Sequence, residues 1–261
     1  MDIPTQLQTS LRPTTTPLPS LPWLTTLLTN TRGTPPPPLA SLLATARARL
    51  LASDLTTAGL LDPTYAATHS FPAATLAAGD GSVREVRLER DVVVQVVDVE
   101  DVGRGRWEVV EGLEAEMRGE GRRGREVVRL PVSAGSGDAE GEEQPDGAQG
   151  QGGGVQPGGG VQDEGSRNST HKLVVQDCAG QTVHAIELKR VERIAVGRTV
   201  IGEKILLRAG TVVARGVVLL EPAQCVLLGG KVEAWHRAWV DGRLARLREA
   251  VGVREQGGRG G

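Results

Sequence analysis

Aromatic side chains are scarce in this chain of 261 residues, which contains four tryptophans, one tyrosine and one phenylalanine. None of the six falls within residues 92–99 or 172–234, where short β-branched runs predict strands. Proteins that hold single-stranded nucleic acid on a β-barrel stack the bases on aromatic side chains, at roughly 1–3 kcal/mol per base. The missing aromatics therefore disfavour strong, autonomous binding of a single strand.

Cysteine and histidine are almost as rare. Cys178 and Cys225 lie in apolar runs, and neither they nor the histidines have the spacing of metal ligands. Gly229-Gly230-Lys231 is followed by valine, which excludes a P-loop, and no Gly-x-Ser-x-Gly nucleophile motif occurs. We therefore predict two reduced core thiols, no metal or other cofactor, and no enzymatic activity.

Long apolar runs and a strong net charge are also lacking. No stretch approaches the ~20 apolar residues of a membrane span, and the first residues do not form a secretion signal. The formal net charge is −2, without the strongly basic footprint of many nucleic-acid-binding domains. These absences predict a soluble, intracellular protein without a membrane partner.

What the sequence does contain is a series of short β-rich runs separated by glycine turns. Residues 181–188 alternate polar with apolar side chains, as a strand with one buried face does. Many short strands with glycine at the bends are typical of a small sheet that closes on itself. We predict a five-stranded OB-type β-barrel, with Leu206 and Leu219 in its core. The runs available as strands are residues 92–99, 172–177, 181–188, 205–208, 211–214, 217–220 and 225–228.

Helical patterns precede the predicted barrel. Residues 1–17 are rich in threonine and proline and are predicted to be unstructured. Ser20, followed by a proline in the first turn, predicts a helix start, and residues 39–51 carry leucines at helical spacing. Ser53 and Asp54 are expected to cap a third, short helix.

A further helical pattern follows the barrel. Trp235 and Trp239 are one helical turn apart, and we expect a helix or helix pair that breaks at Gly242. Both indoles are expected to pack on the barrel or on the N-terminal helices. The fold class is thus predicted as α+β. Its parts are an N-terminal tail and small helical bundle (residues 1–80), the barrel (81–233), and a C-terminal helix with a Gly/Arg tail (234–261).

A long insertion, residues 103–171, interrupts the predicted barrel. A loop of this length in a compact domain is either functional or disordered. Its Gly-rich later part is typical of a flexible spacer, so we expect the insertion to be largely disordered, and a wholly neutral insert is the alternative. Its first third combines the residue types that dominate interface hot spots. The candidate partner-binding residues are Arg104, Arg106, Trp107, Val109, Val110 and Leu113.

Several segments resemble the OB-fold core of the RecQ-mediated genome instability protein 1 family. They are LVVQD at residues 173–177, IE at 186–187, GEKILL at 202–207, RGVVLLEP at 215–222 and VLLGGKVE at 226–233. The motif residues, which the resemblance assigns to the barrel core, are Asp177, Glu187, Lys204, Gly216, Leu219, Pro222, Gly229 and Gly230. The sequence departs from the family pattern in two turns, at residues 178–180 and 202–203.

This resemblance implies a non-catalytic subunit of a complex between topoisomerase III and a RecQ-family helicase. The barrel would dock the topoisomerase, and the insertion would modulate its gate. The implied activity is stimulation of double Holliday junction dissolution and decatenation in homologous recombination and replication repair. The implied location is the nucleus, with DNA contacted through the complex. The chain is similar to short members with a single OB domain, so the second OB-type small subunit is not expected.

Two other functions are also considered. One is an autonomous OB protein that binds single-stranded nucleic acid, and the other is a translation or RNA-binding OB protein. Both lack aromatic and basic support in this sequence. An aliphatic barrel with one long loop fits a protein adaptor better.

Overall fold

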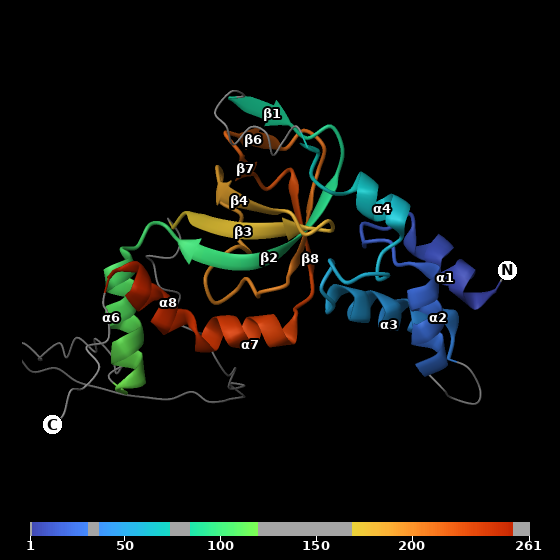
Figure 1. Cartoon of the computed structure of the whole chain (residues 1–261), viewed down its shortest axis with the longest axis horizontal. Helices are drawn as coiled ribbons and strands as arrows, with labels where there is room; N and C mark the ends of the chain where they lie inside the picture. The colour runs from blue at the N-terminus through green and yellow to red at the C-terminus, as the bar shows by residue number, and fades with distance from the viewer. Residues whose placement is uncertain (1, 31–36, 74–83, 120–168, 253–261) are drawn as a thin grey trace, which may run out of the picture.

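The structure is a computed structural model that describes residues 2–30, 37–73, 84–119 and 169–252. N-terminal helices lie at one end, a curled β-sheet lies in the middle with the C-terminal helix α7 beneath it, and α8 lies beside helix α6 at the other end (Figure 1). The predicted α+β architecture is confirmed. The Gly-rich part of the insertion, predicted to be a flexible spacer, lies outside the described residues.

The N-terminal unit consists of α1 (Ile3–Leu11), α2 (Leu21–Asn30), α3 (Leu39–Leu51) and α4 (Pro63–Thr68). The prediction that residues 1–17 are unstructured is wrong. Leu7 and Leu11, one turn apart on α1, are 0% and 4% exposed, because they pack on the other helices. The apolar cluster that they join also contains Leu18, Leu24, Leu27, Leu42 and Ala46.

Side-chain caps mark the starts of α2 and α4. Ser20 Oγ accepts a hydrogen bond from the Trp23 N–H at 3.2 Å, which confirms the predicted cap of α2. The predicted short helix after residue 54 is wrong, because Asp54 instead accepts hydrogen bonds from the N–H and hydroxyl of Thr56 in a turn. The next helix is α4, which Asp62 caps by accepting two backbone N–H groups of its first turn.

The sheet has eight strands rather than the five predicted, in the order β1-β6-β7-β4-β3-β2-β5-β8. Neighbouring strands are antiparallel except β4 and β7, which run parallel. Two consecutive left-handed residues, Arg215 and Gly216, form the turn that separates β6 from β7, and β1 adds an edge to β6. The strands are β1 (Glu85–Arg87), β2 (Val92–Asp101), β3 (His171–Asp177), β4 (Thr182–Glu187), β5 (Lys204–Leu207), β6 (Val212–Ala214), β7 (Val217–Leu220) and β8 (Cys225–Gly229).

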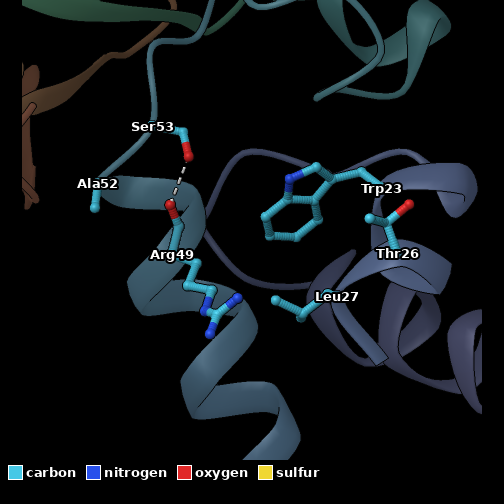
Figure 2. A pocket seen from close by; sticks show the side chains of 6 residues that line it. All are labelled: Trp23, Thr26, Leu27, Arg49, Ala52 and Ser53. Atoms are coloured by element: carbon cyan, nitrogen blue, oxygen red, sulfur yellow. Dashed lines mark hydrogen bonds between the residues drawn. The ribbon is translucent and has the colours of Figure 1, made fainter. Parts of the chain in front are cut away.

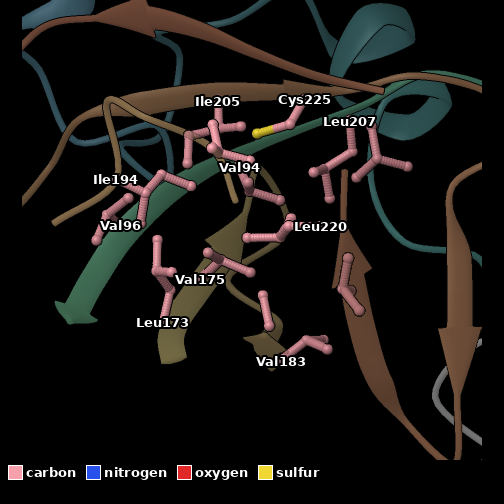
Figure 3. Close-up of a cluster of buried hydrophobic side chains, with 14 of the residues drawn as sticks. Val94, Val96, Leu173, Val175, Val183, Ile194, Ile205, Leu207, Leu220 and Cys225 are labelled. Atoms are coloured by element: carbon pink, nitrogen blue, oxygen red, sulfur yellow. The ribbon is translucent and has the colours of Figure 1, made fainter. Parts of the chain in front are cut away.

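Strands β2 and β5 are buried on both faces. Their inner face belongs to the apolar interior of the curled sheet, part of which Figure 3 shows. On their outer face, Val93 and Leu206 pack with Leu50 and Leu55 of the N-terminal unit. The helices therefore cover the outside of the sheet along these two strands. Leu206, at 4% exposed, is confirmed as a core residue.

Leu219 does not occupy the core position that was predicted. On β7 the buried residues are Val218 and Leu220, whereas Leu219 is half-buried. Successive side chains of a strand point to opposite faces, so an error of one residue in phase exchanges the inner and outer sets.

The C-terminal pair consists of α7 (Glu233–Asp241) and α8 (Arg243–Ala250), and the break at Gly242 is confirmed. Trp235 and Trp239 pack against the apolar interior of the sheet, as one of the two predicted arrangements required. The insertion begins with α6 (Arg106–Met117), a helix that was not predicted.

Both cysteines are free and buried, which confirms the prediction of core thiols. Burial raises the pKa of each thiol to about 12. Within the described ranges, no three His, Cys, Asp or Glu side chains are grouped as a metal site requires. None of the helices described there combines the length and apolar character needed to cross a bilayer.

Candidate partner interface at the root of the insertion

The strand that leads into the insertion is fastened to the C-terminal helices. A bulge in β2 lies between Val96 and Asp98. Asp98 Oδ1 accepts hydrogen bonds from the Val99 N–H at 2.9 Å and from Trp239 Nε1–H at 2.6 Å. Helix α7 is therefore bonded to the strand directly before the insertion leaves the sheet.

Glu100, further along β2, connects three elements. Its carboxylate pairs with Arg106 of α6 at 2.5 Å and with Lys172 of β3 at 3.3 Å. The hydrogen bond from Arg106 is the largest influence on Glu100 and lowers the pKa of its carboxyl, and Lys172 adds to that effect. The first turn of α6 is thus held against the sheet.

Helix α6 packs along α8 (Figure 1). Arg248 of α8 donates to Glu114 Oε1 at 2.9 Å, and Val110 is 2% exposed. Val109 and Leu113 are half-buried. These three aliphatic side chains of α6 are therefore wholly or partly covered by the rest of the chain.

Trp107 has a different environment from these aliphatic residues. It is 53% exposed, and its Nε1–H donates to Glu111 Oε1 at 2.7 Å on the same helix. Met117, at 76% exposed, lies at the other end of α6 and was not among the predicted residues. An exposed indole on a helix that is anchored at both ends provides a preorganised contact for a partner.

The structure thus brings the six predicted residues to one helix and its lead-in, but gives them separate roles. Arg106 is paired with Glu100, and Arg104 is paired with Glu108 at 3.2 Å. Val110 is buried and Val109 and Leu113 are half-buried, so Trp107 is the member with the most accessible apolar surface. Its contact with a partner stays a prediction.

The other end of the insertion returns to the sheet at a buried ionic cluster. Glu187 Oε2 lies 2.8 Å from both the backbone nitrogen and Nδ1 of His171, the first residue of β3. Glu187 Oε1 accepts from Arg190 Nη1 at 2.6 Å and from the Val191 N–H at 2.8 Å. Burial alone raises the pKa of Glu187, but the hydrogen bonds from His171, Val191 and Arg190 outweigh it and lower that pKa.

A second buried polar cluster joins the N-terminal unit to the sheet. Gln95, which is fully buried, accepts the Leu55 N–H at 3.0 Å and donates to Asp54 Oδ1 at 2.7 Å. Lys204, also fully buried, donates to the Gly202 carbonyl at 2.6 Å. Burial lowers the pKa of Lys204 to about 8, although the charge of Asp54 opposes this shift. Gln95 of β2 and its partner Lys204 of β5 therefore lie on the outer face of the sheet, where Gln95 bonds the segment that follows α3.

The remaining motif residues serve turns and close contacts. Asp177, 1% exposed, accepts three backbone N–H groups, one from Phe71 and two from the β3–β4 turn. Pro222 is exposed in the turn before β8, so its assignment to the barrel core is wrong, as is that of Gly216. Gly229 and Gly230 both have positive φ, and Gly230 lies against the end of α3.

Sequence reasoning missed several residues of the insertion root. Asp98 and Trp239 are 141 positions apart, and Glu114 and Arg248 are 134 apart, so no local pattern links them. The spacing of the tryptophans predicted their helix but not the acceptor of the indole N–H. His171 carried no usable signal, because its partner Glu187 is on the neighbouring strand.

Comparison with known proteins gives two family matches along the chain. The model described as RMI1, N-terminal helical domain, matches residues 11–58, and the one described as RMI1, N-terminal OB-fold domain, matches residues 66–243. The chain is also 30% identical over 160 residues to RecQ-mediated genome instability protein 1 of Schizosaccharomyces pombe. That match covers 61% of this chain and 63% of the relative, so the chain spans less than two thirds of the relative's length.

Proposed function

The chain belongs to the RMI1 family, and from this we propose that it is a non-catalytic structural subunit of a RecQ helicase–topoisomerase III complex in the nucleus. Its proposed role is to stimulate double Holliday junction dissolution and decatenation in homologous recombination and replication repair. The name of the relative from Schizosaccharomyces pombe contains the words RecQ-mediated genome instability, which supports the RecQ link. DNA is contacted through the complex.

The proposal gives the sheet and the insertion separate roles, and it rests on the observation that both ends of the insertion are fixed to the folded domain. The insertion's first helix is tied to the sheet by Arg106 and to α8 by Glu114, and its return is tied by His171. In our proposal the curled sheet docks the topoisomerase, and α6 directs the insertion to the gate. A preorganised element loses less entropy on binding than a free loop does.

The alternative is autonomous binding of single-stranded nucleic acid. Single-strand binders present aromatic side chains on strands. All six aromatic residues of this chain lie on helices or connections, and none lies on the eight described strands. This distribution favours the adaptor.

Substitution of Trp107 by alanine tests the insertion's role. We expect Trp107→Ala to leave the melting temperature nearly unchanged, because the indole is 53% exposed. We expect stimulation of topoisomerase III decatenation to fall about tenfold or more, as at an interface hot spot. Leu113 is left unchanged, because its half-buried side chain would confound binding with folding.

Leu188→Ala is the matched control, since Leu188 is a large apolar residue that is 57% exposed just after β4. It should keep full stimulation. Salt-sensitive binding of single-stranded DNA by the free wild-type chain, lost in Trp107→Ala while topoisomerase activity is unchanged, would contradict the proposal.

A further inference from the structure

A hollow of about 310 Å³ lies between α2 and α3, at the opposite end of the molecule from α6 (Figure 1). The guanidinium of Arg49 lies beside Leu27, and the indole nitrogen of Trp23 is on the edge of its ring that faces away from Arg49 (Figure 2). The side chains that line it are Trp23, Thr26, Leu27, Arg49, Ala52 and Ser53.

The unused polar groups of this hollow include two hydrogen-bond donors. Arg49 is exposed, and within the described residues its guanidinium has no hydrogen-bond acceptor or acidic partner. The indole N–H of Trp23 likewise has no acceptor in the described part of the chain, although the ring is half-buried. The N–H of a half-buried tryptophan usually has a hydrogen-bond acceptor. Because none lies within the described residues, this donor is available to a ligand.

Arg49 is not needed to complete the end of α3. The Ala48 carbonyl accepts the Ala52 N–H, and the Leu50 carbonyl accepts the Ser53 N–H, each at 3.1 Å. The carbonyl of Arg49 itself accepts the Ser53 hydroxyl at 2.8 Å. Because these last carbonyls are satisfied, the guanidinium is free to bind outside the chain.

We propose that this Trp23–Arg49 hollow docks an acidic segment of a partner protein, which inserts one Asp or Glu side chain. The carboxylate would accept from the guanidinium, and its aliphatic stem would lie on Leu27 and the indole ring, which leaves the indole N–H to donate to a carbonyl of the same segment. The hydroxyls of Thr26 and Ser53 donate to backbone carbonyls, which leaves their oxygens to accept a partner N–H.

A nucleic-acid backbone fits this hollow less well than a carboxylate does. Binding to a phosphate backbone depends on several cations along a track. Arg49 is the single cation among the residues that line the hollow. Tryptophan and arginine are also the residue types most enriched at protein-interface hot spots. The site is separate from the insertion root and does not depend on the proposed topoisomerase partner.

The chain offers a matched control on the same helix. Arg47 is exposed two residues before Arg49 but lines a different hollow, with Ser10, Leu11 and Leu43. A displayed library of random peptides would be selected on the full wild-type chain. The selected peptides would then be titrated against Arg49→Ala and Arg47→Ala, with melting temperatures measured for both variants.

We expect the selected peptides to be enriched in Asp or Glu beside an aliphatic or aromatic residue. Their affinity should fall roughly tenfold or more in Arg49→Ala, the loss of a charge-assisted hydrogen bond, and stay unchanged in Arg47→Ala. Selection without acidic enrichment, or equal losses in the two variants, would overturn the proposal. Displacement of the peptides by single-stranded DNA at equal ionic strength would also overturn it, in favour of a nucleic-acid site.

Discussion

Replacement of Gly230 by alanine is expected to lower the melting temperature by roughly 10 °C, from a loss of about 3–5 kcal/mol in unfolding free energy. Gly230 has a φ of +89°, where an L side chain is strained. A Cβ there would overlap the Leu51 carbonyl oxygen and lie 2.8 Å from the carbonyl carbon. Relief requires the end of α3 to move away from the sheet, which would open the contact between Leu50 and Leu206.

Substitution of the neighbouring Gly229 distinguishes the cost of backbone strain from the cost of steric overlap. Its φ is +83°, but a Cβ added there would meet nothing within 4 Å. Gly229→Ala should therefore cost only the backbone term of about 1–2 kcal/mol. Thermal melts of the two variants measure the difference. Equal losses would show that α3 does not press on the turn after β8.

Glu187→Ala is expected to be the most destabilising single loss of a charge, by about 3–5 kcal/mol. Removal of this 7%-exposed carboxylate leaves Arg190 and the N–H groups of His171 and Val191 without their buried acceptor. The comparison is Glu221→Ala, which removes an acid paired with the exposed Lys189 at 3.1 Å. That surface pair should contribute about 0–1 kcal/mol.

The effect of Glu187 should also depend on pH in a definite direction. Its folded pKa lies below the ordinary 4.5, so its stabilising contribution is complete above about pH 4.5 and is lost as the pH falls through the folded pKa. Urea unfolding at neutral and acidic pH should show the gap between wild type and Glu187→Ala narrowing in acid. A gap that is constant, or that widens in acid, would show that the carboxylate is not held ionised.

Local sequence patterns were sufficient for most strands and for helices α2, α3, α7 and α8. The β-branched runs predicted β2 to β8 to within a residue or two, because alternation and glycine turns are local signals. The predicted count of five was too low because all seven β-rich runs form separate strands and β1, which no run indicated, adds an eighth at the edge. Helix α1 was missed because its Thr/Pro composition concealed Leu7 and Leu11, whose burial depends on other helices.

The candidate interface at the start of the insertion was harder to predict from the sequence. Residue type alone predicts a partner contact at both Trp107 and Val110. The structure exposes Trp107, whereas Val110 is buried within the chain. Which face of α6 is covered depends on α8, which follows more than a hundred residues later. Periodicity within one segment cannot supply that contact.

Co-purification of the full chain with topoisomerase III, followed by a decatenation assay, tests the proposed function most directly. The adaptor account predicts a complex that co-elutes in size-exclusion chromatography and decatenates faster than the topoisomerase alone. Trp107→Ala should keep co-elution and lose the acceleration. Failure to co-elute at micromolar concentration, together with unchanged decatenation on addition of the wild-type chain, would contradict it.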